Sequence, residues 1–389
     1  MCRKFAGMRT GYALLFIGAI GAQSRAATFT INYNGVPTDA QTCITYAANI
    51  WSGILVSDVP IKLLVSWLPL GTSTLGITFP NGRRDFANAP LDSTWYATSL
   101  ANSIGNVELN PGENDIEIFL SSSANWYTGI DGNPAAGQYD LASIVLHEIC
   151  HGLGFVGLSK KVGGDGSFGL LLSSDFSPLF TTFPWPQLDT LPSAFDRHLE
   201  NNASNLLTDL VNPSTQLGAA LSNNQVYFSG PLTNIANGGS HARVYAPSTF
   251  ALGSSCVHLN ESTYPAGNVN ELMTPFSSAG VANHWPGPVC LGILRDIGWT
   301  LAPDVGITET VIDGDGLVCY PNPATTELWM RTGDDFGRGT VVISDPSGRP
   351  VMAARDHRSL DISVLADGIY IVIRTVDGSS MRGRFIKDQ

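Results

Sequence analysis

The sequence predicts an α+β domain followed by a small antiparallel β-sandwich, behind an export signal. Strand and helix periodicities alternate over residues 27–302, short β-rich runs recur over residues 317–389, and an apolar segment with a basic start opens the chain. At 389 residues, with 43% hydrophobic and 14% charged side chains, the chain has the length for two folded domains and the composition of a globular protein.

Residues 1–26 have the layout of a signal peptide. Basic residues precede an apolar run at residues 12–22, and Ser24 and Ala26 supply small side chains before a cleavage site. This run is too short for a permanent transmembrane helix, and no other stretch is long enough. We therefore expect cleavage after Ala26, export, and no transmembrane segment.

The acidic charge is concentrated in the larger predicted domain. Residues 28–302 carry 20 acidic and 8 basic side chains, whereas residues 316–389 carry nine of each. A nucleic-acid-binding protein needs clustered Lys and Arg to displace counterions. The large domain lacks such clusters, so nucleic acid is not an expected partner.

Strands followed by helices in the first half of this domain favour an α/β lobe whose sheet backs a helix. Apolar residues between positions 158 and 256 occur only in short pieces separated by Ser, Asn, Pro and Gly, so we expect a long irregular insertion there. Residues 303–316 are expected to form a short linker. The expected strands are residues 27–34, 60–70 and 115–123.

Three helices are expected in the same domain. Apolar residues recur at helical spacing over residues 38–55, 141–153 and 288–299. Thr38 and Asp140 are the expected caps of the first two helices.

The segment HEICH at residues 147–151 is an H-E-x-x-H motif on the second expected helix. A spacing of four places His147 and His151 on one helical face, where their nitrogens reach one zinc ion at roughly 2.0–2.1 Å. Glu148 lies beside them and can deprotonate a zinc-bound water, whose pKa zinc lowers from about 15.7 to about 7. The motif therefore predicts a metal-dependent hydrolase.

Two histidines leave such a zinc site one ligand short. Gly154 follows the motif as in the metzincin metallopeptidases, but Gly157 stands where their third histidine would be. The chain resembles leishmanolysin-like metzincins, which place a long insertion before that histidine and a methionine turn after it. The matching segments are HEICHGLGF, CVHLNESTYPAGNVNELMTPF and LGILRDIGW, within residues 28–302.

This resemblance implies a metzincin-like catalytic domain over residues 27–302 and a secreted zinc endopeptidase that hydrolyses protein or peptide substrates. Glu148 would be the general base, and Met273 would lie beneath the metal. Thr274 and Pro275 follow Met273, so no tyrosine can be assigned there as a further transition-state donor. The implied ligands of Zn2+ are His147, His151 and His258.

Two alternatives stay open. One is a zinc hydrolase of another class with an acidic third ligand such as Asp175 or Glu200, and His241 is a further competing donor. The other is an exported adhesin or binding protein with a structural zinc site. A closed four-ligand site would favour the second alternative, because a catalytic site keeps one position for water.

Five cysteines remain after removal of the signal peptide. Export permits disulfide bonds, and an odd number leaves at least one thiol outside them. Cys256 and Cys290 are the preferred pair, because they flank the segment that contains His258 and Met273.

The final region, residues 317–389, has short β-rich runs that predict an immunoglobulin-like β-sandwich. YPNPA, VVISDPSGRPV, LADGIYIVIRT and the ending GRFIK resemble the C-terminal sorting domain of the type IX secretion system. The resemblance implies recognition by that machinery after passage through the periplasm, and a secreted or cell-surface protein. An ordinary β-sandwich binding module is the alternative. The expected strands are residues 328–331, 341–344, 360–364, 369–375 and 383–387.

Overall fold

The computed structural model describes residues 25–71, 73–179, 190–302, 317–331, 336–344, 350–376 and 379–387. The chain divides into two units, Met1–Gly306 and Ile307–Gln389, and the division falls within the segment expected to be a linker. That segment and most of the expected signal peptide lie outside the described residues. None of the described helices has the length and apolar character needed to cross a membrane.

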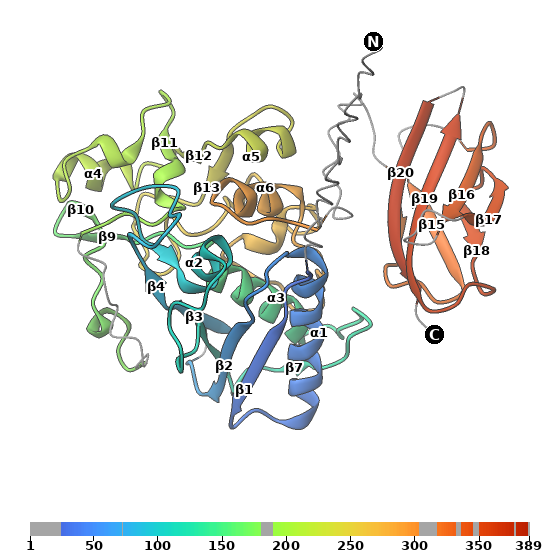
Figure 1. The fold of residues 1–389 in the computed structure, drawn as a ribbon, viewed down its shortest axis with the longest axis horizontal. Helices are drawn as coiled ribbons and strands as arrows, with labels where there is room; N and C mark the ends of the chain where they lie inside the picture. Colours follow the sequence, from blue (N-terminus) through green and yellow to red (C-terminus); the bar gives the residue numbers. More distant parts are fainter. Residues whose placement is uncertain are drawn as a thin grey trace, which may run out of the picture. The chain divides into compact units, whose positions relative to one another are not determined.

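The first unit contains a four-stranded sheet, in the spatial order β1 (Phe29–Asn34), β2 (Ile61–Leu68), β6 (Ile116–Ser121) and β3 (Gly76–Pro80). Figure 1 labels β1, β2 and β3 of this sheet. The first three strands are parallel, and β3 is an antiparallel edge strand. Every residue of β6 is buried, as expected for a central strand. The sequence predictions for β1, β2 and β6 are confirmed with shorter ends, whereas the sequence pattern does not predict β3.

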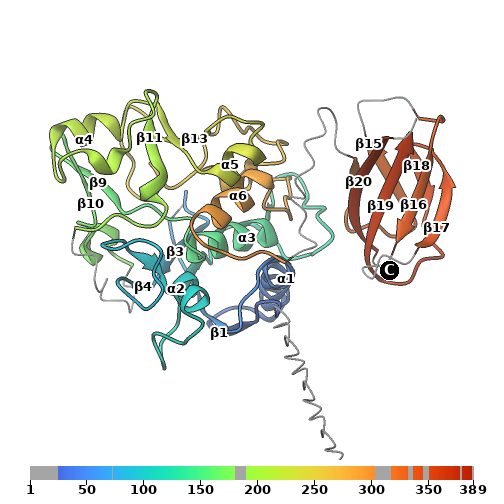
Figure 2. The ribbon, with the colours of Figure 1, turned by 45° about the horizontal axis from the view of Figure 1, so that its top comes forward.

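Two helices, α1 (Thr38–Ile54) and α3 (Leu141–Gly152), pack against each other in both views (Figures 1 and 2). The Nε1–H of Trp51 on α1 donates to the backbone carbonyl of Leu146 on α3 at 3.0 Å. Helix α3 also contacts β3 and β6. Ten of its twelve residues are buried, so α3 lies in the core rather than on the surface.

The predicted N-cap of α3 is confirmed, and that of α1 is wrong. Asp140 accepts a hydrogen bond from the Ser143 N–H at 2.8 Å. Thr38 is the first helical residue of α1, and Pro37 precedes it without any side-chain cap. Pro37 has the extended conformation that is usual for the residue before the first helical turn.

The expected insertion contains short elements. Helix α5 (Pro231–Ala236) packs on α6 (Pro288–Asp296), and Asp296 accepts the Thr233 N–H at 2.8 Å. Helix α6 ends three residues before its predicted end, because Gly298 has φ +125° and breaks the helical conformation. The short strands of the insertion are β9 (Ser159–Val162), β10 (Asp165–Phe168), β11 (Leu199–Asn201), β12 (Val226–Phe228) and β13 (Ala242–Val244).

The remaining regular elements of the first unit are short. The helices among them are α2 (Thr98–Gly105), α4 (Thr215–Ala220) and four 3₁₀ turns, η1 (Ser173–Phe176), η2 (Asp196–His198), η3 (Leu207–Asp209) and η4 (Glu271–Met273). The strands are β4 (Gly82–Arg83), β5 (Tyr96–Ala97), β7 (Trp126–Tyr127) and β8 (Tyr139–Asp140).

The second unit has two antiparallel sheets (Figure 2). One contains β14 (Val318–Tyr320), β15 (Glu327–Arg331) and β18 (Ser359–Asp361). The other contains β17 (Pro350–Arg355), β16 (Thr340–Ser344), β19 (Gly368–Val376) and β20 (Ser379–Lys387). Both sheets contribute to one core, with Leu328 and Met330 from the first and Val372 and Phe385 from the second. The more specific immunoglobulin-like class stays a prediction.

Four of the five strands predicted in this unit are confirmed. The strand predicted over residues 360–364 is confirmed only at its start, because β18 ends at Asp361, although the Ile362 N–H still donates to the carbonyl of Thr326. The sequence pattern does not predict β14 or β17. Proline and alanine, which occur in β17, are depleted in strands, so cross-strand pairing decides its conformation.

A buried ion pair joins β19 to the chain after β17. Arg374 bonds both oxygens of Asp356, at 2.7 Å and 2.8 Å. Its guanidinium also lies 4.9 Å from the centre of the Phe336 ring. Burial raises the pKa of Asp356, but the hydrogen bonds and charge of Arg374 outweigh burial and hold that pKa below its usual value.

We predict that Asp356→Asn lowers the free energy of unfolding of the second unit by about 3–5 kcal/mol, because it leaves the Arg374 charge buried and uncompensated. Hydrogen exchange of the β16 and β19 amides in the full chain measures the change. Asp361→Asn is the control, since Asp361 is exposed and accepts the Ser363 N–H at 2.9 Å, a hydrogen bond that the asparagine side chain can keep. Equal effects of the two substitutions would contradict the prediction.

The same pair makes this unit sensitive to acid. The pKa of Asp356 is lower in the folded state than its unfolded value of about 3.9. Its stabilisation is therefore complete above about pH 4 and is lost as the pH falls through the folded pKa. We expect the stability difference between wild type and Asp356→Asn to shrink over that range.

Candidate metal centre

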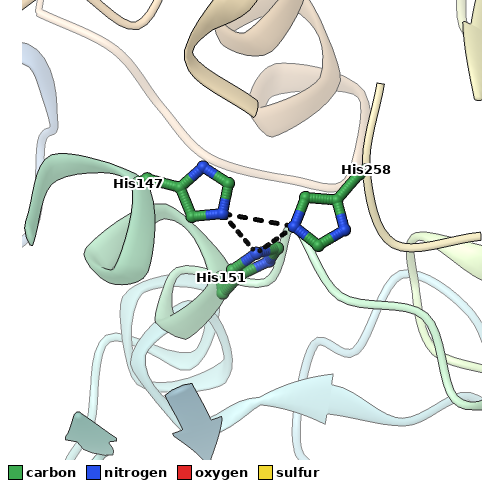
Figure 3. Close-up of side chains that lie close together, drawn as sticks. All are labelled: His147, His151 and His258. Carbon is green, nitrogen blue, oxygen red and sulfur yellow. Dashed lines mark hydrogen bonds between the residues drawn. The ribbon is translucent and has the colours of Figure 1, made fainter. Parts of the chain in front are cut away.

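Three histidines from two distant segments converge in the first unit (Figure 3). His147 and His151 lie one turn apart on α3, and His258 lies on the loop between β13 and η4. The Nε2 atom of His151 is 3.0 Å from that of His147 and 3.2 Å from that of His258. The Nε2 atoms of His147 and His258 are 3.2 Å apart. The structure therefore brings together all three histidines that the sequence suggested as ligands.

The other nitrogen of each ring, Nδ1, faces a backbone carbonyl oxygen. A carbonyl oxygen only accepts hydrogen bonds, so each Nδ1 carries the hydrogen and each neutral ring leaves Nε2 as a bare lone pair. The three Nδ1 distances are 2.6 Å from His147 to Leu272, 2.7 Å from His151 to Phe155 and 3.0 Å from His258 to Ser254.

Burial keeps these rings neutral. It lowers the pKa of His147 to about 4 and that of His258 to about 3, and it holds the pKa of His151 well below its usual value. Three lone pairs therefore point toward one another at 3.0–3.2 Å. Such lone pairs repel one another unless a cation lies among them, so the three rings form a candidate metal site.

The spacing of the nitrogens fits a small tetrahedral ion. Two nitrogens bound to one tetrahedral zinc at about 2.0–2.1 Å are about 3.3 Å apart, close to the observed separations. Among the described residues no fourth His, Cys, Asp or Glu joins the group. Three protein ligands with one position open are typical of catalytic rather than structural zinc sites. Imidazole donors also suit copper, iron and nickel.

Gly157 explains why the third histidine comes from a distant segment. A Cβ atom at this position would lie 2.6 Å from the carbonyl oxygen of Cys256 and 2.7 Å from Oδ1 of Asp196. The segment that carries His258 thus lies against Gly157 and leaves no space for a side chain there. Asp196, from the insertion, also accepts the Leu158 N–H at 2.8 Å. This carboxylate therefore ties the insertion to the residues that follow α3.

The predicted methionine turn lies against the first histidine. Met273 is fully buried, and its carbonyl accepts the Leu259 N–H at 2.7 Å. The preceding residue, Leu272, supplies the carbonyl that orients His147. The turn therefore holds His147 and the residue after His258 together. A specific function of the Met273 thioether beneath the metal stays a prediction.

The competing third donors have other partners. Asp175 pairs with Lys160 at 2.7 Å. Glu200 forms an ion-pair contact with His241. The three-histidine group includes neither carboxylate nor His241, so the structure favours His258 as the third ligand.

Glu148 lies beside the histidines with its carboxylate almost fully buried. Its Oε2 accepts the Thr78 hydroxyl at 2.6 Å. Gly76, also on β3, makes room for it, because a Cβ there would lie 2.6 Å from Oε1. Burial raises the pKa of Glu148 to about 7, and the Thr78 hydrogen bond opposes this shift in part. Sequence reasoning misses Gly76 and Thr78 because it does not predict β3.

A cleft of about 520 Å³ contains the three histidines and Glu148. Residues 73–80, which include β3, line one part of it, and residues 252–255, 257, 258 and 274–277 line another. Within the described ranges, no strand pairs with the second edge of β3. The cleft therefore combines a candidate metal site, a buried carboxylate and an edge of β3 that pairs with no described strand.

The preferred cysteine pair is wrong. The sulfur of Cys290 lies 3.3 Å from that of Cys150. Cys256 instead directs its sulfur toward the carbonyl of Leu221 at 3.6 Å. The first turn of α6 therefore meets α3, and proximity in the sequence to His258 does not bring Cys256 to Cys290.

Two family models match parts of the chain. Residues 105–236 match a family described as SPBPB7E8-like, a range that includes α3 but ends before His258. Residues 318–388 match the family described as secretion system C-terminal sorting domain. No curated protein matches the chain. Among solved structures, CopC from Methylosinus trichosporium OB3b is 22% identical over 19% of this chain and 93% of its own, with a TM-score of 0.16.

The sorting-domain match confirms the predicted destination of the chain. The second unit carries a sorting domain of the type IX secretion system, and the protein is exported to the cell surface or secreted. This result also confirms the type IX secretion machinery as a partner.

We predict that His258→Ala weakens metal binding by at least about 100-fold, because removal of an outer-shell partner alone costs 10–100-fold. Metal content per chain after dialysis against a weak chelator measures the loss. His241→Ala is the matched control and should keep the metal, since His241 contacts Glu200 instead. Loss of metal in the control with retention in His258→Ala would exclude His258 as a ligand.

Proposed function

We propose that this protein is a secreted zinc-dependent endopeptidase with a metzincin-like catalytic domain, similar to the leishmanolysin-like enzymes. The observation that carries the proposal is the convergence of His147, His151 and His258 beside the buried carboxylate of Glu148. An H-E-x-x-H helix with a distant third histidine and a following methionine turn also supports it.

The chemistry divides between the metal and Glu148. A zinc ion held by the three histidines would acidify a bound water to a pKa of about 7 and polarise a substrate carbonyl. Thr78 bonds Oε2 of Glu148, which leaves Oε1 to take the proton from water. Glu148 then donates this proton to the leaving amine. A carboxylate whose pKa is raised to about 7 can accept and release a proton near neutral pH.

The shape of the cleft favours an extended polypeptide as substrate. The edge of β3 that pairs with no described strand would offer backbone N–H and C=O groups to a peptide that adds as another strand. Gly76 and Thr78, which position Glu148, lie on that same strand. A peptide bound along β3 would therefore pass the base and the metal site.

The alternatives have less support. A structural zinc site needs a fourth protein ligand, and the group has three among the described residues. An acidic third ligand would have to replace His258, but Asp175 and Glu200 both have other partners.

We predict that Glu148→Gln keeps the metal at its wild-type content and lowers kcat by about 10²–10⁴-fold, because it removes the base but keeps the shape of the side chain. Hydrolysis of casein or gelatin by the purified mature chain, measured beside metal content, tests this. Glu113→Gln, at an exposed carboxylate that pairs with Arg83, is the control and should keep full activity. Equal turnover in wild type and Glu148→Gln would remove Glu148 from the mechanism.

We also predict that deletion of residues 317–389 leaves a folded, active peptidase in the periplasm of the native host. The physical reason is that the first unit has its own core, whereas the deleted part carries the sorting domain. Activity and immunoblots of periplasm, cell surface and medium measure the distribution. Appearance of the truncated chain outside the cell would show that sorting does not depend on this unit.

A further inference from the structure

We infer that Cys150 and Cys290 form a disulfide bond in the exported protein, which joins the metal-binding helix α3 to α6. Their sulfur atoms lie 3.3 Å apart, and both residues are fully buried. Of the five cysteines in the described ranges, these two are the pair whose sulfur atoms are in contact. The inference does not depend on the proposed peptidase activity.

The backbone already places both side chains for the bond. A disulfide has an S–S length of about 2.05 Å, so each sulfur would move by about 0.6 Å, a shift that side-chain rotation can supply. Cys150 lies on α3, which is buried along nearly its whole length. Cys290 lies in the first turn of α6, where the Asn270 side chain accepts the Val289 N–H at 3.0 Å. Both sulfurs are therefore carried by firmly packed segments.

Export brings the two thiols to a compartment where they can be oxidised to a disulfide. Outside the cytoplasm, a thiol oxidoreductase in its disulfide form, or oxidised glutathione, is the oxidant. One cysteine attacks the disulfide of the oxidant and forms a mixed disulfide, and the second cysteine then displaces the oxidant as a thiol. Two protein thiols become one disulfide, and the oxidant gains two electrons and two protons. Because both sulfurs are buried in the folded unit, this exchange takes place before α6 closes on α3.

The bond would close a loop that contains the whole insertion and His258. A cross-link across a long loop reduces the conformational freedom of the unfolded chain. The third histidine reaches the metal site only when this loop is closed. The disulfide would therefore favour the folded state in which the three histidines meet.

Peptide mapping of the mature protein, purified from the culture medium, tests the proposal directly. The chain is denatured without reductant, alkylated with iodoacetamide and digested for mass spectrometry. We expect peptides with Cys150 and Cys290 to be linked, and Cys43, Cys256 and Cys319 to carry the label. If Cys150 and Cys290 are both labelled without reduction, the proposal is wrong.

Thermal unfolding gives a second test. Cys150→Ala, Cys290→Ala and the double variant should all lower Tm by about the same 5–10 °C, because the first substitution already breaks the bond. A reductant should lower the Tm of the wild type by the same amount and leave that of the double variant unchanged, whereas an equal wild-type Tm with and without reductant would contradict the proposal. Cys43→Ala is the control, and its effect should add to that of either substitution. If the variants do not fold, the peptide map of the wild type still shows whether Cys150 and Cys290 are linked.

Discussion

Three hydrogen bonds from imidazole Nδ1 atoms to backbone carbonyls set the chemistry of the larger unit. They fix the tautomer of each ring, and burial keeps the rings neutral, so that three bare nitrogens meet. The accepting carbonyls belong to η4, to the chain after α3 and to the segment before His258. The candidate metal site therefore forms only when these three segments occupy their folded positions, and a bound metal would stabilise all of them together.

The residues of the site that lie on α3 could be predicted from the sequence. Of those that distant segments contribute, only His258 and Met273 were predicted. His147, Glu148 and His151 share a helix, where spacing alone fixes which side chains are neighbours. No neighbouring residue in the sequence marks His258 as a ligand. It was predicted from the order of the motifs in the leishmanolysin-like metzincins, which the chain resembles. Thr78 and Gly76 could not be predicted, because their importance comes from β3 pairing with β6 beside α3.

In the fold, too, local features could be predicted from the sequence and long-range contacts could not. The strands and helices with clear periodicity were predicted with small errors at their ends, since these errors depend on single residues such as Gly298. The choice of Cys256 as the partner of Cys290 was wrong because the packing of α6 on α3, rather than proximity along the chain, determines which sulfurs meet. In the second unit, β17 owes its conformation to pairing with β16 rather than to its own residues.

Strand β3 connects substrate binding to catalysis in the proposed enzyme. Its Thr78 hydroxyl holds one oxygen of Glu148, and its Gly76 leaves the space that the other oxygen occupies. Its second edge pairs with no described strand, and in the proposed enzyme an extended peptide would bind there. A shift of β3 would therefore move the general base and the peptide-binding edge together. A side chain at position 76 would displace the carboxylate even though all three histidines stayed in place, so the glycine is as much a requirement of the site as the ligands are.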